Sequence, residues 1–429
     1  MIRDKKIFYF ILLAVIFLIL LGVYHDMRTC WGSNDFDTYY FAGNLVRSGE
    51  NLYTHEVFRT TMGPYLYLPF FALLISPLTF LHIRFASAIW YVFNILVFAG
   101  TVYLSVEIAA GKGKFSQIFA TRPYLLRIVS VIFPVMVWVD NACLAQVDIL
   151  VFFLLLLSLF AYEKKRPFLS GVVLAIAGVI KIYPFYFLLY FLAKRRFKAV
   201  IGFFAGILLF IFIVPWVGLG QDNFMDSMKS WVAIRVMPYM EMGGQTVGDN
   251  FAHYEAQLKP KNQALSAVVT RYSIRDDEDV SRMKKEDFEY EIYWPHPLRP
   301  VQVDIVVKTL LLIIFAVTFL NLDYGRRYRD GLYPSLEYSI VFLSMLLLFP
   351  MVKSHTLAAV IFPVIAFNCA QSKGGIIGRP MRIIFLLAIV LYVLQVVEYM
   401  SVLGTGCFAV LILWLLFLKI IRKERLLRA

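Results

Sequence analysis

Two carboxylates, Asp35 and Asp37, stand beside an aromatic pair, Tyr39 and Tyr40, a short distance after the first apolar segment of the chain. A carboxylate can act as a general base that takes a proton from an attacking hydroxyl group. The simpler alternative is that Asp35 only caps a helix, since Asp is a favoured N-cap residue. Two carboxylates beside two tyrosines favour the functional interpretation.

Two more polar groups interrupt segments that are otherwise strongly apolar. Gln146 and Asp148 form a polar tip between two apolar runs, and Asp148 lies inside the second run. An ionisable side chain there is costly and marks a candidate functional site, although an interhelical hydrogen bond would also explain it. Lys181 lies close to Pro184 in a third apolar stretch. It either forms a structural ion pair with Asp140 or Asp148, or it binds a phosphate group as a point charge.

The last polar group is Lys353 and His355, at the end of a late apolar run. At the same depth as Asp148 and Lys181, these two side chains would complete a phosphate pocket. The groups together predict a polar cavity in which cations match an anionic phosphate and a carboxylate serves as base. The cysteines show no metal-binding spacing, and we expect neither a metal nor another cofactor.

The composition indicates what kind of protein must position these groups. Of the 429 residues, 60% are hydrophobic and 17% are charged, against roughly 45–50% and 25% in soluble domains. A soluble core of this size could not hide so much apolar surface. The net charge is 42 − 29 = +13, but the basic residues gather in short turns between apolar runs, which is typical of membrane proteins and not of nucleic-acid binding. The sequence therefore predicts an all-α polytopic membrane protein.

Twelve apolar segments are candidates to cross the membrane. With the basic N-terminus inside, twelve crossings return the basic C-terminus to the inside and place the basic turns in the cytoplasm. The chain 1–429 is then a single integral membrane domain with an outer catalytic loop at 25–84, a large outer loop at 218–300 and C-terminal helices over 302–421. The segments are 7–23, 85–106, 124–140, 146–162, 168–181, 184–193, 197–217, 302–321, 336–350, 355–371, 381–401 and 404–421.

Two apolar segments are expected not to be simple membrane-spanning helices. Residues 65–81 are apolar enough to cross, but a crossing would move the basic turn 164–166 to the outside, so we expect them to lie in the outer interface. The stretch 178–184 should be the tip of a helical hairpin with Lys181 at its outer end. Non-helical backbone at membrane depth is tolerated only where protein or a water-filled cavity covers it.

The first outer loop should contain a helix that carries the two carboxylates. Ser33, Asn34 or Asp35 would cap it, and Gly49 would end it. Positions two apart on a helix do not share a face. Only one of the two carboxylates, Asp35 or Asp37, should therefore point into the cavity.

Four stretches match a known pattern when they are taken together. They are Asp35-Phe-Asp-Thr-Tyr-Tyr-Phe-Ala-Gly43 followed by Tyr67-Leu-Pro69, Gln146-Val-Asp148 followed by Gly178-Val-Ile-Lys-Ile-Tyr-Pro184, Asn262-Gln-Ala-Leu265 followed by Arg271, and Phe349-Pro-Met-Val-Lys-Ser-His355. In this combination the chain resembles glycosyltransferase family 87.

The resemblance implies a GT-C-like fold. It also implies transfer of a sugar, commonly mannose, from a polyprenyl-phosphate carrier to a lipid or glycan acceptor on the extracytoplasmic face of the cell (inner) membrane. In this family the early Asp acts as the catalytic base, and the matching residue here is Asp35. A base on the face opposite the leaving phosphate would give inversion at the anomeric carbon. The other expected substrate-binding residues are Asp37, Tyr39, Tyr40, Gln146, Asp148, Lys181, Lys353 and His355, with the cations neutralising the leaving phosphate.

Two other classes of protein stay open at this point. A transporter or flippase for a lipid-linked sugar would also use a broken helix with a charge at its tip. The absence of an inverted repeat, and polar groups on one face instead of at the midplane, weigh against it. A non-catalytic structural subunit would leave the Asp pair and Lys181 without a purpose.

Overall fold

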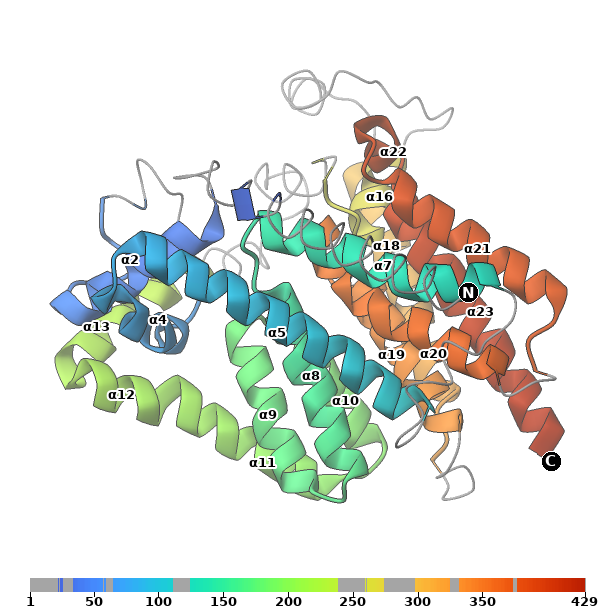
Figure 1. The fold of residues 1–429 in the computed structure, drawn as a ribbon, viewed down its shortest axis with the longest axis horizontal. Coiled ribbons are helices and arrows are strands. Elements are labelled where there is room, and N and C mark those ends of the chain that lie inside the picture. The colour runs from blue at the N-terminus through green and yellow to red at the C-terminus, as the bar shows by residue number, and fades with distance from the viewer. Residues whose placement is uncertain are drawn as a thin grey trace, which may run out of the picture.

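Helices form all the secondary-structure elements that the structure describes. The computed structural model covers residues 22, 24–25, 34–56, 58, 65–110, 124–237, 259, 261–273, 298–324, 332–372 and 376–428. In these residues the elements are α-helices joined by short 3₁₀ and π segments (Figure 1). The all-α expectation is confirmed for this part of the chain.

The first described helix, α2 (Asp35–Ser48), begins and ends as predicted. Asn34 is its N-cap, and the Asn34 side-chain oxygen accepts the N–H of Asp37 at 3.2 Å. Gly49 closes the helix in the left-handed region with φ 74°, where a residue without Cβ fits easily. Asp35 is thus the first helical residue and not the cap.

The segment predicted to lie at the interface forms two short helices. They are α4 (Pro69–Ile75, 7 residues) and the 3₁₀ helix η1 (Ser76–Phe80, 5 residues). Seven α-helical residues and five 3₁₀ residues span about 20 Å at roughly 1.5 and 2.0 Å per residue, well short of a bilayer core of about 30 Å. Both helices pack on α2. The two helices are together too short to span a bilayer core by themselves, and the interfacial position of 65–81 stays a prediction.

The middle of the chain forms a group of helices joined by tight turns. In Figure 1, α8, α9, α10 and α11 stand side by side, and α5 crosses in front of them. The bounds are α5 (Ile83–Ala110), α7 (Tyr124–Cys143), α8 (Asp148–Glu163), α9 (Pro167–Ile180), η2 (Tyr183–Phe185), α10 (Tyr186–Ala193), α11 (Phe197–Ile207), the π-helical η3 (Leu208–Ile213) and α12 (Val214–Leu219).

Helices α9 and α11 touch through their backbones at two glycines. A Cβ at Gly171 would overlap the carbonyl oxygen of Ala199, and a Cβ at Gly202 would overlap that of Phe168. Small residues let membrane helices approach this closely. The contact fixes the ends of α9 and α11 beside each other.

One long apolar element is mostly buried, and helices from the middle and the end of the chain enclose it. That element is the 3₁₀ segment η5 (Ser354–Val360) with α20 (Ile361–Ser372), which pack against α5, α7, α8 and α19. The predicted outer loop 218–300 contributes three helices, which are α13 (Gln221–Trp231), the π-helical η4 (Val232–Val236) and α16 (Leu265–Ser273). The C-terminal helices are α18 (Pro300–Leu320), α19 (Tyr333–Leu348), α21 (Arg379–Leu394), α22 (Glu398–Val402) and α23 (Thr405–Arg428).

Five of the described helices are long and apolar enough to cross a membrane. They start at Ile83, Phe197, Val301, Ser354 and Thr405, and further apolar helices of 10–17 residues accompany them. The number of twelve crossings is therefore not confirmed, and the predicted span 7–23 lies outside the described residues except for Gly22. Several predicted spans are instead short helices, because a turn interrupts the apolar run, as at Lys181.

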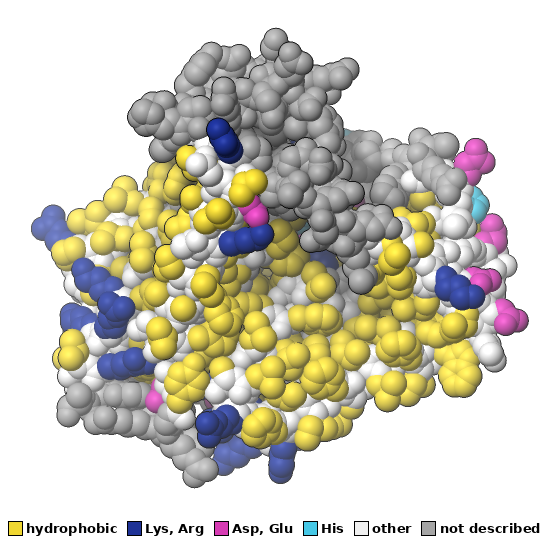
Figure 2. All heavy atoms as spheres, turned by 180° about the vertical axis from the view of Figure 1, so that it is seen from behind, with side chains coloured by type: hydrophobic (Ala, Val, Ile, Leu, Met, Phe, Trp, Pro, Cys, Tyr) yellow, Lys and Arg dark blue, Asp and Glu magenta, His cyan; other side chains and the backbone are white. Residues whose placement is uncertain are grey.

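Two of the long apolar helices expose much of their surface, as helices in contact with lipid do. In the most apolar stretch of 197–219 and of 301–320, only 28% and 22% of the residues are buried. In 354–371 the share is 89%. Figure 2 shows apolar side chains spread over a broad area of one face, with Lys and Arg gathered towards its edges. Such an area on helices is typical of contact with lipid.

Candidate active site

The start of α2 docks on the turn between α7 and α8. The Asp35 N–H donates to the carbonyl of Leu144 at 3.3 Å. Ala145 in the same turn has φ 53°, a strained value for a residue with a side chain, and the N–H of Gln146 closes the turn on the carbonyl of Asn141 at 2.9 Å. The turn thereby presents the Gln146 amide, which donates to Asp35 Oδ2.

Two tyrosines complete the surroundings of Asp35. The Tyr39 hydroxyl donates to Asp35 Oδ2 at 3.3 Å and lies 3.0 Å from the hydroxyl of Tyr67. Burial raises the pKa of Tyr67 to about 12, so both groups stay protonated and can donate. Burial also raises the pKa of the Asp35 carboxyl above 3.8, and the nearby charges of Lys181 and Lys353 only partly offset this effect. A raised pKa makes the carboxylate a stronger base.

A second centre forms around Asp148, the first residue of α8. Its side chain is 0% exposed, and its Oδ2 lies 2.6 Å from Lys181 Nζ and 3.8 Å from His355 Nε2. The Tyr183 hydroxyl donates to Asp148 Oδ1 at 3.3 Å. Of the two partners that the sequence allowed for Lys181, the structure pairs it with Asp148 and not with Asp140.

Lys181 owes its position to the end of α9. The helix stops at Ile180, and the Lys181 N–H still bonds to the carbonyl of Ala177 at 3.0 Å while Lys181 itself is extended. Pro184 cannot continue the helix, so the chain turns through η2 into α10. The Lys181 side chain remains 22% exposed although its partner is fully buried. The partly exposed Lys181 side chain thus joins the buried Asp148 to the edge of the site.

The long loop holds the late motif against this centre. The side-chain oxygen of Asn262 accepts the N–H of Val352 at 3.1 Å, and its amide donates to the carbonyl of Pro350 at 3.2 Å. The Asn141 amide donates to the carbonyl of His355 at 3.2 Å. The stretches around Asn262 and His355, far apart in the sequence, thus meet.

The structure brings most of the predicted site residues together. Asp35, Tyr39 and Gln146 form one group, and Asp148, Lys181 and His355 form the other. Lys353 is exposed at the side of this site, and Asp37 is buried on another face of α2. Tyr40 lies elsewhere, because its hydroxyl donates to the carbonyl of Leu81 at 2.9 Å.

Two site tyrosines were not predicted from the sequence. Tyr67 contacts the Tyr39 hydroxyl, and Tyr183 donates to Asp148. Each sits inside one of the quoted stretches, Tyr67-Leu-Pro69 and Lys181-Ile-Tyr-Pro184. A tyrosine one or two positions before a proline in an apolar segment is a weak signal, because such residues also serve as plain interface anchors. In the described part of the chain, no group of three or more His, Cys, Asp and Glu side chains could hold a metal ion.

Fold and site together define a helical membrane protein with a buried polar centre at one end of its helices. The chain belongs to glycosyltransferase family 87, whose model matches residues 65–350. The matched range includes Gln146, Asp148 and Lys181 and begins after Asp35. The resemblance drawn from the sequence is confirmed.

The chain is also similar, over part of its length, to a mycobacterial mannosyltransferase. The chain is 27% identical over 259 residues to the polyprenol-phosphate-mannose-dependent alpha-(1-2)-phosphatidylinositol mannoside mannosyltransferase of Mycobacterium tuberculosis (strain ATCC 25618 / H37Rv), a match that covers 57% of this chain and 55% of that protein. The chain therefore spans little more than half the length of that relative. No solved structure gives a significant match.

Proposed function

We propose that this protein is a hexosyltransferase that moves mannose from a polyprenyl-phosphate carrier to a hydroxyl group of a lipid or glycan acceptor. The observation that carries the proposal is the placement of a base-like carboxylate, Asp35, next to the Asp148–Lys181 pair in a chain of glycosyltransferase family 87. The mannosyltransferase relative supports the choice of donor.

The proposed reaction is a single displacement. Asp35 takes the proton of the acceptor hydroxyl, and the freed oxygen attacks the anomeric carbon of the sugar. The bond from that carbon to the phosphate oxygen breaks on the opposite face, so the configuration inverts and polyprenyl phosphate leaves with the electron pair. Lys181 is the first cation to meet the charge that develops on this phosphate, and His355 and Lys353 lie on the same side.

Gln146 and Tyr39 act on the base and not on the sugar. Both donate to the same oxygen of Asp35, which leaves the other oxygen for the acceptor. Held in this way, the carboxylate need not reorient when the acceptor arrives. We assign no substrate contact to Asp37 or Tyr40, since Asp37 is buried on another face of α2 and the Tyr40 hydroxyl donates to the carbonyl of Leu81.

The site is proposed to face the outside of the cell membrane. The centre is at one end of α8 and α9, and the basic turns 164–166 and 194–196 are at the other. Basic turns favour the cytoplasm, which leaves Asp35 on the extracytoplasmic side.

The test uses purified protein in sealed vesicles of known orientation with radiolabelled polyprenyl-phosphate mannose. We expect free polyprenyl phosphate and a mannosylated acceptor to form only when donor and acceptor meet the face that carries Asp35. The Asp35→Asn variant is the matched control for background hydrolysis. Movement of intact donor between leaflets without release of polyprenyl phosphate would instead identify a flippase.

The pH dependence of this turnover follows from the raised pKa of Asp35. A base works only when it is deprotonated, so turnover should fall as the pH drops through the pKa of Asp35, which lies above 3.8. The hydrogen bond from Tyr39 lowers this pKa, so Tyr39→Phe should move the acid limb of the rate profile to higher pH. A profile that is identical in Tyr39→Phe and in the parent protein would contradict the assignment of Asp35 as the titrating group.

A further inference from the structure

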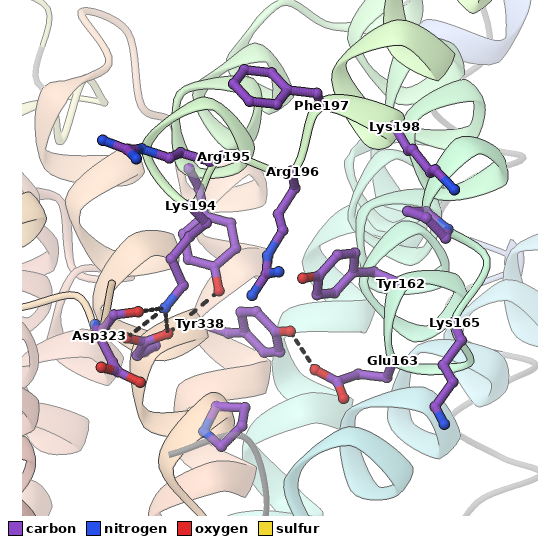
Figure 3. A pocket seen from close by; sticks show the side chains of 14 residues that line it. Tyr162, Glu163, Lys165, Lys194, Arg195, Arg196, Phe197, Lys198, Asp323 and Tyr338 are labelled. Atoms are coloured by element: carbon purple, nitrogen blue, oxygen red, sulfur yellow. Dashed lines mark hydrogen bonds and ion pairs between the residues drawn. The ribbon is translucent and has the colours of Figure 1, made fainter. Parts of the chain in front are cut away.

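A pocket of about 790 Å³ lies at the opposite end of α8 and α9 from the candidate active site (Figure 3). The 16 residues of α8 separate the two sites by about 24 Å at 1.5 Å per residue. Five cationic side chains line the pocket: Lys165, Lys194, Arg195, Arg196 and Lys198. The acidic lining residues are Glu163, Asp323 and Glu337, so the lining carries a net charge of 5 − 3 = +2.

Two basic turns of the same shape form the wall of this pocket. In each turn the middle residue is left-handed, Lys165 with φ 62° and Arg195 with φ 54°. In each turn the following arginine, Arg166 or Arg196, returns its N–H to a carbonyl at the end of the preceding helix, at 2.9 and 2.8 Å. The next helix, α9 or α11, then starts without a side-chain cap.

The two helix starts add to the positive potential. Uncapped N–H groups at a helix N-terminus carry a partial positive charge and favour anions. The close contact of α9 and α11 at Gly171 and Gly202 keeps the two N-termini side by side. Charged side chains and helix ends therefore act on the same space.

The charged side chains that line the pocket differ in whether they have a partner. Lys194 Nζ lies 2.9 Å from Glu337 Oε2, and both side chains are less than 10% exposed, so this pair is satisfied. The Tyr338 hydroxyl donates to Glu163 at 2.5 Å. Arg196 differs, because its Nε is buried and has no hydrogen-bond partner among the described residues.

The Arg196 guanidinium is directed into the pocket. Figure 3 shows it reaching towards the space between Tyr162 and Tyr338, and its Cζ lies 5.8 Å from the centre of the Tyr162 ring. The Arg196 side chain as a whole is partly exposed and lines the pocket, and a guanidinium matches a phosphate with two parallel hydrogen bonds. This geometry fits a phosphate that bonds to Arg196 in the pocket.

Apolar side chains border the same pocket. Phe197 lines it and is 60% exposed, and Phe168 and Ile201, on the neighbouring turns of α9 and α11, are 51% and 60% exposed. A free phosphate ion would leave these apolar side chains exposed to water. The acyl chains of a lipid would cover them, which is favourable because apolar surface is removed from water. We propose that this pocket binds the phosphate headgroup of an anionic phospholipid, with Arg196 as the main contact and the acyl chains along Phe197 and α11.

The test measures binding of lipid to the full-length protein in nanodiscs or detergent. Phosphatidylglycerol added to a phosphatidylcholine background should raise the melting temperature and be retained in native mass spectrometry. Arg196→Gln should weaken this binding about tenfold or more, since a hydrogen bond to a charged group contributes roughly that factor. Arg166→Gln is the matched control, because Arg166 occupies the same place in the twin turn but does not line the pocket.

Each alternative result has a defined meaning. Equal weakening by Arg196→Gln and Arg166→Gln would indicate general attraction to a basic surface and would overturn the proposal. Protection by inorganic phosphate that equals that of phosphatidylglycerol would overturn the lipid as the source of the phosphate. If Arg196→Gln does not fold, Lys198→Gln, an exposed lining residue, replaces it, and unchanged phosphatidylglycerol binding in that variant would contradict the proposal.

Discussion

Asp35→Asn is expected to reduce turnover of the donor by at least about a hundredfold, and by up to about ten-thousandfold, because general-base catalysis contributes factors of that size. Asn cannot accept the proton of the acceptor hydroxyl. The substitution should leave the fold intact, since the N-cap of α2 is Asn34 and the docking bond to Leu144 comes from the Asp35 backbone. The measurement is release of polyprenyl phosphate, with expression and melting temperature as checks on folding.

Asp37→Asn is the comparison for this experiment. Asp37 is two positions further along α2, on a different face, and its backbone N–H bonds to Asn34 whatever its side chain is. We expect a weakened enzyme at most. If Asp37→Asn is inactive and Asp35→Asn is active, the base is Asp37, and if both keep full activity, the transferase assignment of this loop is wrong.

Lys181→Ala is expected to affect stability and turnover together. Asp148 is 0% exposed, and removing the partner of a buried charge costs about 3–5 kcal/mol. Turnover should fall by about 100- to 1,000-fold, as it does when a donor that stabilises developing charge is removed. The first effect is structural and the second is catalytic, so a single variant cannot separate them.

The double variant Asp148→Asn with Lys181→Ala separates the two effects. It removes both charges, so no buried carboxylate is left uncompensated, and most of the lost melting temperature should return. Turnover should stay low, because Lys181, the first cation to meet the leaving phosphate, is absent. Recovery of turnover along with stability would show that the ion pair only holds α8 to the end of α9, and that another cation, such as Lys353, carries the phosphate.

Local rules in the sequence determined the ends and breaks of several helices. Asn34 and Gly49 delimit α2 as predicted, because capping needs only a side-chain oxygen at one end and a left-handed residue at the other. Pro184 ends the helical run near Lys181, because proline has no N–H to donate. The membrane character follows from composition alone. The quoted stretches were also sufficient to identify the family.

Only the tertiary structure decided which polar groups meet. The sequence left Lys181 free to pair with Asp140 or Asp148, and it said nothing of the bond from Gln146 to Asp35 or of the contact between Tyr39 and Tyr67. Helices that are buried on all sides have no periodic apolar stripe that indicates their neighbours, as α19, with 14 of its 16 residues buried, illustrates. For the same reason the count of apolar runs did not separate helices that cross from those that only pack. Which helices touch depends on backbone fit, such as that of α9 and α11 at Gly171 and Gly202, and this fit exists only once the helices are assembled.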